Sequence, residues 1–209
     1  MTFFGFRGAK SHEWTFCDPI SNRRKEEIEL TEIDEKAMIL GVGNLLLRDE
    51  GVGVHVAINL QEYSLPDNIE VIEGGTDGFK LFHLIMEADR LIVVDCVKGG
   101  DEPASIYRFE IDDFDHFPDP YKTSVHQVSI TEVIKLTGTM RTPPRTTIIG
   151  IEPDEISMSM ELSPRIQAKL PKVLEIVLET AGLDPEEYRE KLESPLKQPG
   201  PPSYSDTAV

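Results

Sequence analysis

Cysteine, long apolar runs and positive charge are all scarce in this sequence. Two cysteines, Cys17 and Cys96, occur in 209 residues. That is too few for a disulfide framework or a cysteine-rich zinc knuckle, so we expect a reducing, cytoplasmic environment. No apolar stretch approaches the roughly 20 residues of a transmembrane helix. Charged and polar residues follow Phe3, Phe4 and Phe6 at once, so we expect neither a signal peptide nor a membrane anchor.

The shortage of positive charge limits the kinds of partner. Lysine and arginine number 21 against 38 aspartates and glutamates, for a formal charge of −17. The field of so acidic a chain repels nucleic acid and anionic membrane surfaces, so we expect neither as a partner. The charge does not identify the partner, and nothing in the sequence calls for more than a monomer.

Two common hydrolase motifs are also absent. The sequence contains no Gly-x-Ser-x-Gly elbow, which argues against a serine hydrolase. It contains no His-Glu-x-x-His zinc motif either. Cys96 is predicted to point into the core, on the opposite face of its strand from Asp95.

The chain divides into three regions by composition. Residues 1–36 show no clean periodicity and are predicted to be an N-terminal extension that is partly ordered at best. Residues 37–183 carry the regular apolar patterns of one domain. Residues 184–209 are charged and then rich in proline and serine, and we predict a disordered tail.

Short apolar runs alternate with helical patterns through the domain. Strands are predicted at 37–42, 69–72, 91–97, 105–109 and 146–151, and helices at about 52–61, 79–88, 125–136 and 164–180. Gly74 and Gly75 are expected to break the second strand. Such alternation predicts an α/β fold in three layers, with a mostly parallel, twisted sheet and helices on both faces. In such sheets, sites form beyond the carboxyl ends of the strands.

The turn after the first strand begins Gly41-Val42-Gly43, as a dinucleotide-binding fingerprint would. Leu46 stands at the third glycine position, and Asp49 and Glu50 precede the helix where a pyrophosphate would lie. Two carboxylates there would repel phosphate. A simple helix cap explains one of them, which leaves Glu50 available for another role.

Two further residues stand out by position. Asp95 lies in a strand predicted to be buried on both faces, where a carboxylate must be paired or bound to a metal. A structural aspartate at a strand end is an equally good interpretation. Ser124 and Gln127 form a capping box that places His126 in the first turn of a helix. There the helix dipole favours a neutral imidazole, although a lone histidine at this position is more often structural.

Together these residues predict a site. Glu50 follows the first strand, Asp95 ends the third and His126 opens a helix, so all three can face one crevice. Two carboxylates and an imidazole make an open site for a divalent transition metal, although the spacing does not select the ion. The turn Gly74-Gly75-Thr76 ends another strand on the same side and is predicted to contact substrate.

Five segments resemble, in order, the hydrogenase maturation endopeptidases. They are Gly41 to Asn44 with Asp49 to Gly53, then Gly74 to Thr76, Leu91 to Val97, His126-Gln127, and Gly150 to Pro153. The resemblance covers about 38–182. It implies that Glu50, Asp95 and His126 are catalytic, metal-binding positions. These would engage nickel already inserted in a hydrogenase large-subunit precursor, from which the enzyme removes a C-terminal peptide.

On this resemblance, nickel is supplied by or shared with the precursor, and other divalent metals can occupy the site. The alternative is a noncatalytic nickel-handling or hydrogenase assembly chaperone on the same fold. Incubation with nickel-loaded precursor separates them, because only a protease shortens it. A third interpretation, a nucleotide-binding oxidoreductase, requires nucleotide binding, against which Leu46, Asp49 and Glu50 argue.

Overall fold

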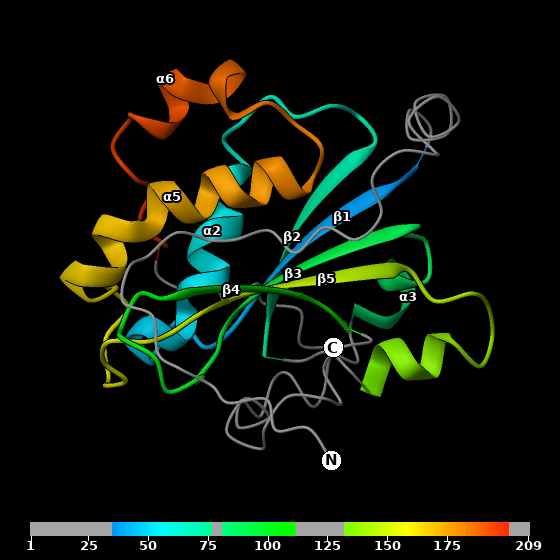
Figure 1. Ribbon diagram of the computed structural model, residues 1–209, viewed down its shortest axis with the longest axis horizontal. Coiled ribbons are helices and arrows are strands. Elements are labelled where there is room, and N and C mark those ends of the chain that lie inside the picture. Colours follow the sequence, from blue (N-terminus) through cyan, green and yellow to red (C-terminus); the bar gives the residue numbers. More distant parts are fainter. Residues whose placement is uncertain (1–34, 77–80, 112–131, 201–209) are drawn as a thin grey trace, which may run out of the picture. The chain divides into compact units, whose positions relative to one another are not determined.

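The computed structural model of the protein describes residues 35–76, 81–111 and 132–200, which belong to one compact unit, Asp34–Val209. Its described strands form a five-stranded sheet in the order β2-β1-β3-β5-β4 (Figure 1). The strands are β1 (Ala37–Val42), β2 (Ile69–Gly75), β3 (Arg90–Cys96), β4 (Ile106–Glu110) and β5 (Arg145–Ile151). All pairs are parallel except β4, which runs antiparallel to β5 at one edge. Buried apolar runs therefore form the central strands, and the alternating run forms the edge, as predicted.

Helices cover both faces of this sheet (Figure 1). The described residues include the helices η2 (Arg48–Gly51), α2 (Val52–Leu60), α3 (Phe82–Ile85), α5 (Pro164–Thr180), η6 (Pro185–Tyr188) and α6 (Arg189–Leu192). Residues 132–137 are also helical. α2 and α5 pack on one face, whereas α3 and residues 132–137 pack on the other. The predicted three-layer α/β fold is confirmed.

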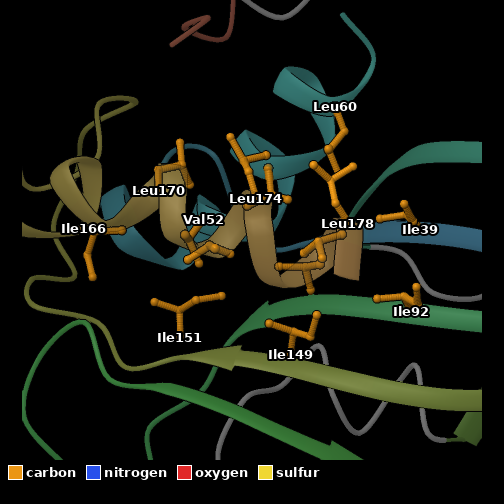
Figure 2. Close-up of a cluster of buried hydrophobic side chains, with 14 of the residues drawn as sticks. Ile39, Val52, Leu60, Ile92, Ile149, Ile151, Ile166, Leu170, Leu174 and Leu178 are labelled. Carbon is orange, nitrogen blue, oxygen red and sulfur yellow. The ribbon is translucent and has the colours of Figure 1, made fainter. Parts of the chain in front are cut away.

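The larger core lies between α5, α2 and the sheet. Figure 2 shows side chains of α5 above Ile149 and Ile151 of β5, beside Val52 and Leu60 of α2. The apolar residues of α5 recur at helical spacing and are buried: Ile166, Leu170, Val173, Leu174, Val177 and Leu178. Each such side chain contributes roughly 1.5–3 kcal/mol on burial. Ser163 starts the helix, because its side chain accepts a hydrogen bond from the Ile166 amide (3.4 Å).

The glycines around β1 allow helix α2 to approach the sheet closely. A Cβ on Gly53 would lie 2.1 Å from the Val94 carbonyl oxygen and 2.4 Å from that of Val42. A Cβ on Gly41 would lie 2.0 Å from the Gly53 carbonyl oxygen. Larger residues would therefore push the first turn of α2 off β1 and β3. This packing explains Gly41, the first glycine of the pattern that resembles a nucleotide fingerprint.

Two element predictions need correction. Gly74 and Gly75 do not break β2, because Gly75 pairs with Val42 across a register shift and forms the last residue of the strand. The second predicted helix is shorter than expected, since α3 spans Phe82–Ile85. Residues 77–80 and the predicted helix start at 125 lie outside the described residues.

The predicted disordered tail is wrong for residues 184–197. After α5 the chain forms η6 and α6, and the ring of Tyr188 stacks on that of Tyr63 with centroids 5.8 Å apart. Leu192 and Leu196 pack against the α5 core. Asn59 fixes the end of this segment, because its side chain accepts from the Lys197 amide (2.8 Å) and donates to the Lys197 carbonyl (3.1 Å). A few apolar residues in a charged stretch are enough to dock it.

Within the described residues, no helix combines the length and apolar character needed to cross a membrane.

Candidate functional site

The candidate site lies where the order of the sheet reverses. From β1 the chain crosses to β2 on one side, whereas β3 lies on the other side of β1. The loops that leave β1 and β3 therefore diverge at the carboxyl ends of these strands, which is where sites form in such sheets. Glu50 lies in η2, directly after β1, and Asp95 is the second-last residue of β3. Both predicted carboxylates thus lie at the same edge of the sheet.

Asp95 is completely buried, as the sequence predicts. One of its oxygens, Oδ1, accepts a hydrogen bond from the Cys96 amide at 2.7 Å. Val94 and Cys96, its neighbours, pack in the core beneath α2 and α5. Because side chains alternate along a strand, Asp95 points to the opposite face, which carries α3.

Cys96 is a core residue, which confirms its predicted orientation. Its side chain is 4% exposed, and burial raises the pKa of the thiol. The negative charges of Asp95, Glu50 and Asp49 raise this pKa further. A neutral, buried thiol is a poor nucleophile, so Cys96 is unsuited to covalent catalysis. The same electrostatics place three carboxylates within Coulombic reach of one sulfur atom.

Asp49 has a different role from the cap that the sequence suggested. No side chain caps α2, whose N-cap residue is Gly51. Instead the buried Asp49 carboxylate accepts hydrogen bonds from the amides of Asp154 (3.0 Å), Glu155 (2.8 Å) and Ser163 (2.7 Å). The Ser163 hydroxyl donates a fourth, at 2.8 Å. Asp49 therefore ties the turn that carries Glu50 to the loop between β5 and α5.

Glu152 is a second carboxylate whose role was not predicted. It directly follows β5 and is 8% exposed. Its Oε2 accepts hydrogen bonds from the amides of Gly99 (2.6 Å) and Gly100 (3.0 Å) and from the Tyr107 hydroxyl (2.7 Å). Burial is the main cause that raises the pKa of Tyr107, and the hydrogen bond to Glu152 raises it further. The phenol therefore stays protonated and can donate. The position of Glu152 one residue beyond a buried strand was the available signal.

The remaining predicted residues are only partly described. Gly74 and Gly75 end β2, and Thr76 begins the following turn. The Gly75 carbonyl accepts a hydrogen bond from the Gly43 amide at 2.9 Å, which links this turn to the one after β1. The predicted substrate contacts of this turn stay a prediction.

His126 lies outside the described residues. Among those described, no three His, Cys, Asp or Glu side chains gather closely enough to hold a metal ion. The carboxylates of Glu50 and Asp95 are donors of the kind that bind divalent ions, so they fit two of the three predicted positions. The complete metal site stays a prediction.

His55 links α2 to the same β5–α5 loop. It is 1% exposed, and its Nε2 lies 3.1 Å from the Met160 carbonyl oxygen, to which it can donate. Its Nδ1 is buried and has no hydrogen-bond partner among the described residues. Burial lowers the pKa of His55 from 6.5, although the Met160 bond and the Asp49 charge act in the opposite direction.

We expect this histidine to make the folded state sensitive to acid. Below pH 6.5 the unfolded chain binds a proton at His55 that the folded chain does not. The contribution of neutral His55 to the free energy of unfolding is therefore fully present above pH 6.5. It falls as the pH drops toward the lower folded-state pKa, by up to about 1.4 kcal/mol per pH unit. Urea unfolding between pH 5 and 7 should show a smaller slope for His55→Gln than for wild type. His83→Gln, at an exposed position on α3, should keep the wild-type slope.

A family model described as hydrogenase maturation protease matches residues 54–180, a range that includes Asp95 and His126. The hydrogenase expression/formation protein HupD of Bradyrhizobium diazoefficiens is 33% identical over 153 residues, which cover 65% of this chain and 80% of HupD. The hydrogenase 2 maturation protease of Escherichia coli is 33% identical over 150 residues, which cover 68% of this chain and 88% of that protein.

Solved structures show the same likeness. The hydrogenase maturating endopeptidase HybD from Escherichia coli superposes with a TM-score of 0.64 at 30% identity, over 71% of this chain and 95% of HybD. The [NiFe] hydrogenase maturation protease HybD from Thermococcus kodakarensis superposes with a TM-score of 0.60 at 26% identity, over 70% of this chain and 99% of that protein.

Proposed function

This chain belongs to the hydrogenase maturation protease family, and on that premise we propose that it removes a C-terminal peptide from the nickel-loaded precursor of a nickel-iron hydrogenase large subunit. As a member of this family it is a peptidase, and the precursor is its substrate. The observation that carries the proposal is the position of Glu50 and Asp95 at the carboxyl ends of adjacent strands, where the sheet order reverses.

The proposed site recognises whether the precursor contains nickel. Glu50, Asp95 and His126 supply two carboxylates and an imidazole, which leave coordination positions open for groups from the precursor. Nickel belongs to the substrate here, and an ion shared between the two proteins would dock the precursor and polarise a carbonyl or water. The enzyme's own residues hold and orient the segment to be cut. Cytoplasmic location and a monomeric state stay predictions.

The proposed hydrolysis uses no covalent intermediate on the enzyme. Water adds to the scissile carbonyl, the C–N bond breaks, and the proton lost by water reaches the leaving amine. Cys96 is excluded as nucleophile by its burial and raised pKa. Serine- and cysteine-directed inhibitors should therefore leave processing unchanged.

Mass spectrometry of purified precursor, incubated with the full-length enzyme, tests this function. Nickel-loaded precursor should lose its C-terminal peptide, whereas nickel-free precursor should be cut at least about a hundredfold more slowly, since an ion contributes several kcal/mol to such a transition state. Equal trimming of both forms would contradict nickel recognition but leave the protease activity. Intact nickel-loaded precursor, with folded enzyme present, would contradict the proposed reaction.

A further inference from the structure

A hollow of about 440 Å³ opens beside the candidate site. Lys98 and Gly100, from the loop after β3, line one side, and residues 152–156, after β5, line the other. β3 and β5 are parallel neighbours, so both loops leave the carboxyl edge of the sheet. The hollow therefore lies at the edge that carries Asp95 and Glu50.

Both walls of this hollow are anchored to the candidate site. Lys98 follows Asp95 by three residues, and the intervening Val97 amide donates to the Ile151 carbonyl at 2.9 Å. On the other wall, the Glu155 amide donates to Asp49, and the Glu155 carboxylate forms an ion pair with Arg48 at 3.4 Å. Arg48 and Asp49 belong to η2, as does Glu50. A ligand in the hollow thus lies beside the elements that carry both candidate carboxylates.

Glu152 provides a polar group held in place for such a ligand. Three donors fix its Oε2, whereas no described residue donates a hydrogen bond to its Oε1. Gly150 is the strand partner of Asp95, and Glu152 lies two residues further along, on the same face of the sheet. A largely buried carboxylate with one oxygen fixed and the other available is an acceptor that needs little reorganisation.

Exposed apolar side chains lie on the loop that follows Glu152 and on the turn that is hydrogen-bonded to this loop. Ile156 is 37% exposed and lines the hollow, and Met158, two residues later, is 82% exposed. Leu46 is 50% exposed and is linked to the end of the same loop, because the Ser159 amide donates to its carbonyl at 3.1 Å. These are three of the five large hydrophobic residues exposed among the described parts of the chain. Apolar walls around a few fixed polar groups are typical of a binding site.

We propose that this hollow is the subsite that binds the precursor beside its scissile bond, in extended form. Glu152 Oε1 accepts a backbone N–H of the bound segment, and Ile156, Met158 and Leu46 cover its apolar side chains. The inference rests on the proposed function, because an endopeptidase must hold chain next to the bond that it cuts. A polypeptide is the occupant that needs both a backbone acceptor and an apolar rim.

Glu152→Gln tests this subsite in the full-length enzyme. The glutamine carbonyl oxygen can still accept from Gly99, Gly100 and Tyr107, but its NH₂ group replaces the acceptor Oε1. We expect KM for nickel-loaded precursor to rise at least about tenfold, because a charge-assisted hydrogen bond to the substrate is lost. The value of kcat should change less than about twofold. Glu161→Gln is the matched control, because its exposed side chain lies on the same loop but outside the hollow.

Hydrogen–deuterium exchange over residues 97–104 separates binding from loop support. In Glu152→Gln the protection of this loop should match wild type, whereas Glu152→Ala, which removes both oxygens, should lose it. Unchanged KM in folded Glu152→Gln would overturn the subsite. So would a rise in KM accompanied by faster exchange in that variant, because a loosened loop would explain it. If the wild-type enzyme leaves nickel-loaded precursor intact, the proposed function fails. The subsite is then tested separately by the Kd for precursor, which should be higher for Glu152→Gln than for wild type; equal values would overturn the subsite.

Discussion

Glu50→Gln, Asp95→Asn and His126→Ala should each reduce processing of nickel-loaded precursor by at least about a hundredfold. Residues that merely support a metal ligand already affect activity by roughly 10–100-fold, and these three are the proposed ligands themselves. Each change removes or weakens a metal-binding atom. The Glu50→Gln and Asp95→Asn changes keep the side-chain volume, whereas His126→Ala does not. The measurement is the initial rate of peptide release, followed by mass spectrometry under single-turnover conditions.

The control for these variants is Asp67→Asn. Asp67 is exposed in the turn before β2, at the opposite edge of the parallel sheet. The Asp67→Asn enzyme should therefore process precursor at the wild-type rate. Thermal unfolding must show that each site variant is folded, which matters most for Asp95 because its carboxylate is completely buried. A folded Glu50→Gln or His126→Ala enzyme with wild-type rate would remove that residue from the site.

Most of the fold could be predicted from local patterns. β1 and α5 have the predicted bounds, because a buried strand and a long amphipathic helix leave strong periodic signals. The edge strand was recognisable from its alternation. Docking of the C-terminal segment was not, since Tyr188, Leu192 and Leu196 are widely spaced in a charged stretch and find their partners across the fold. Contacts between distant parts of the chain leave no periodic pattern of apolar residues in the local sequence.

The candidate site was only partly predictable for the same reason. A carboxylate inside a buried strand is conspicuous in a sequence, and Asp95 could therefore be singled out. The roles of Asp49, which was interpreted as a helix cap, and of Glu152 were not predicted, because their hydrogen-bond donors lie about a hundred and about fifty residues away in the sequence, respectively. Most of these donors are backbone amides, which every residue type except proline provides. Only the folded chain shows that Asp49 and Glu152 hold loops at the carboxyl edge.

Asp49 should contribute more to stability than any other polar residue at this edge. Its buried carboxylate accepts four hydrogen bonds, from Asp154, Glu155 and Ser163. Removing it would leave three amides and a hydroxyl without their acceptor, and hydrogen bonds to charged groups contribute about 1.5–3 kcal/mol each. Such contributions are not additive, because the loop can relax towards water once the carboxylate is lost.

We therefore expect Asp49→Ala to lower the free energy of unfolding by roughly 3–5 kcal/mol, or the melting temperature by about 10 °C. Urea denaturation at pH 7.5, where His55 is neutral in both states, measures this change. Asp154→Ala is the matched control for stability, because Asp154 donates its amide to Asp49 while its own side chain is exposed. Ser163→Ala should lose about 1–2 kcal/mol, since it removes one donor to Asp49 and the cap of α5. If Asp49→Ala costs no more than Asp154→Ala, the buried carboxylate does not hold the β5–α5 loop, and the anchoring of Glu50 through η2 must be abandoned with it.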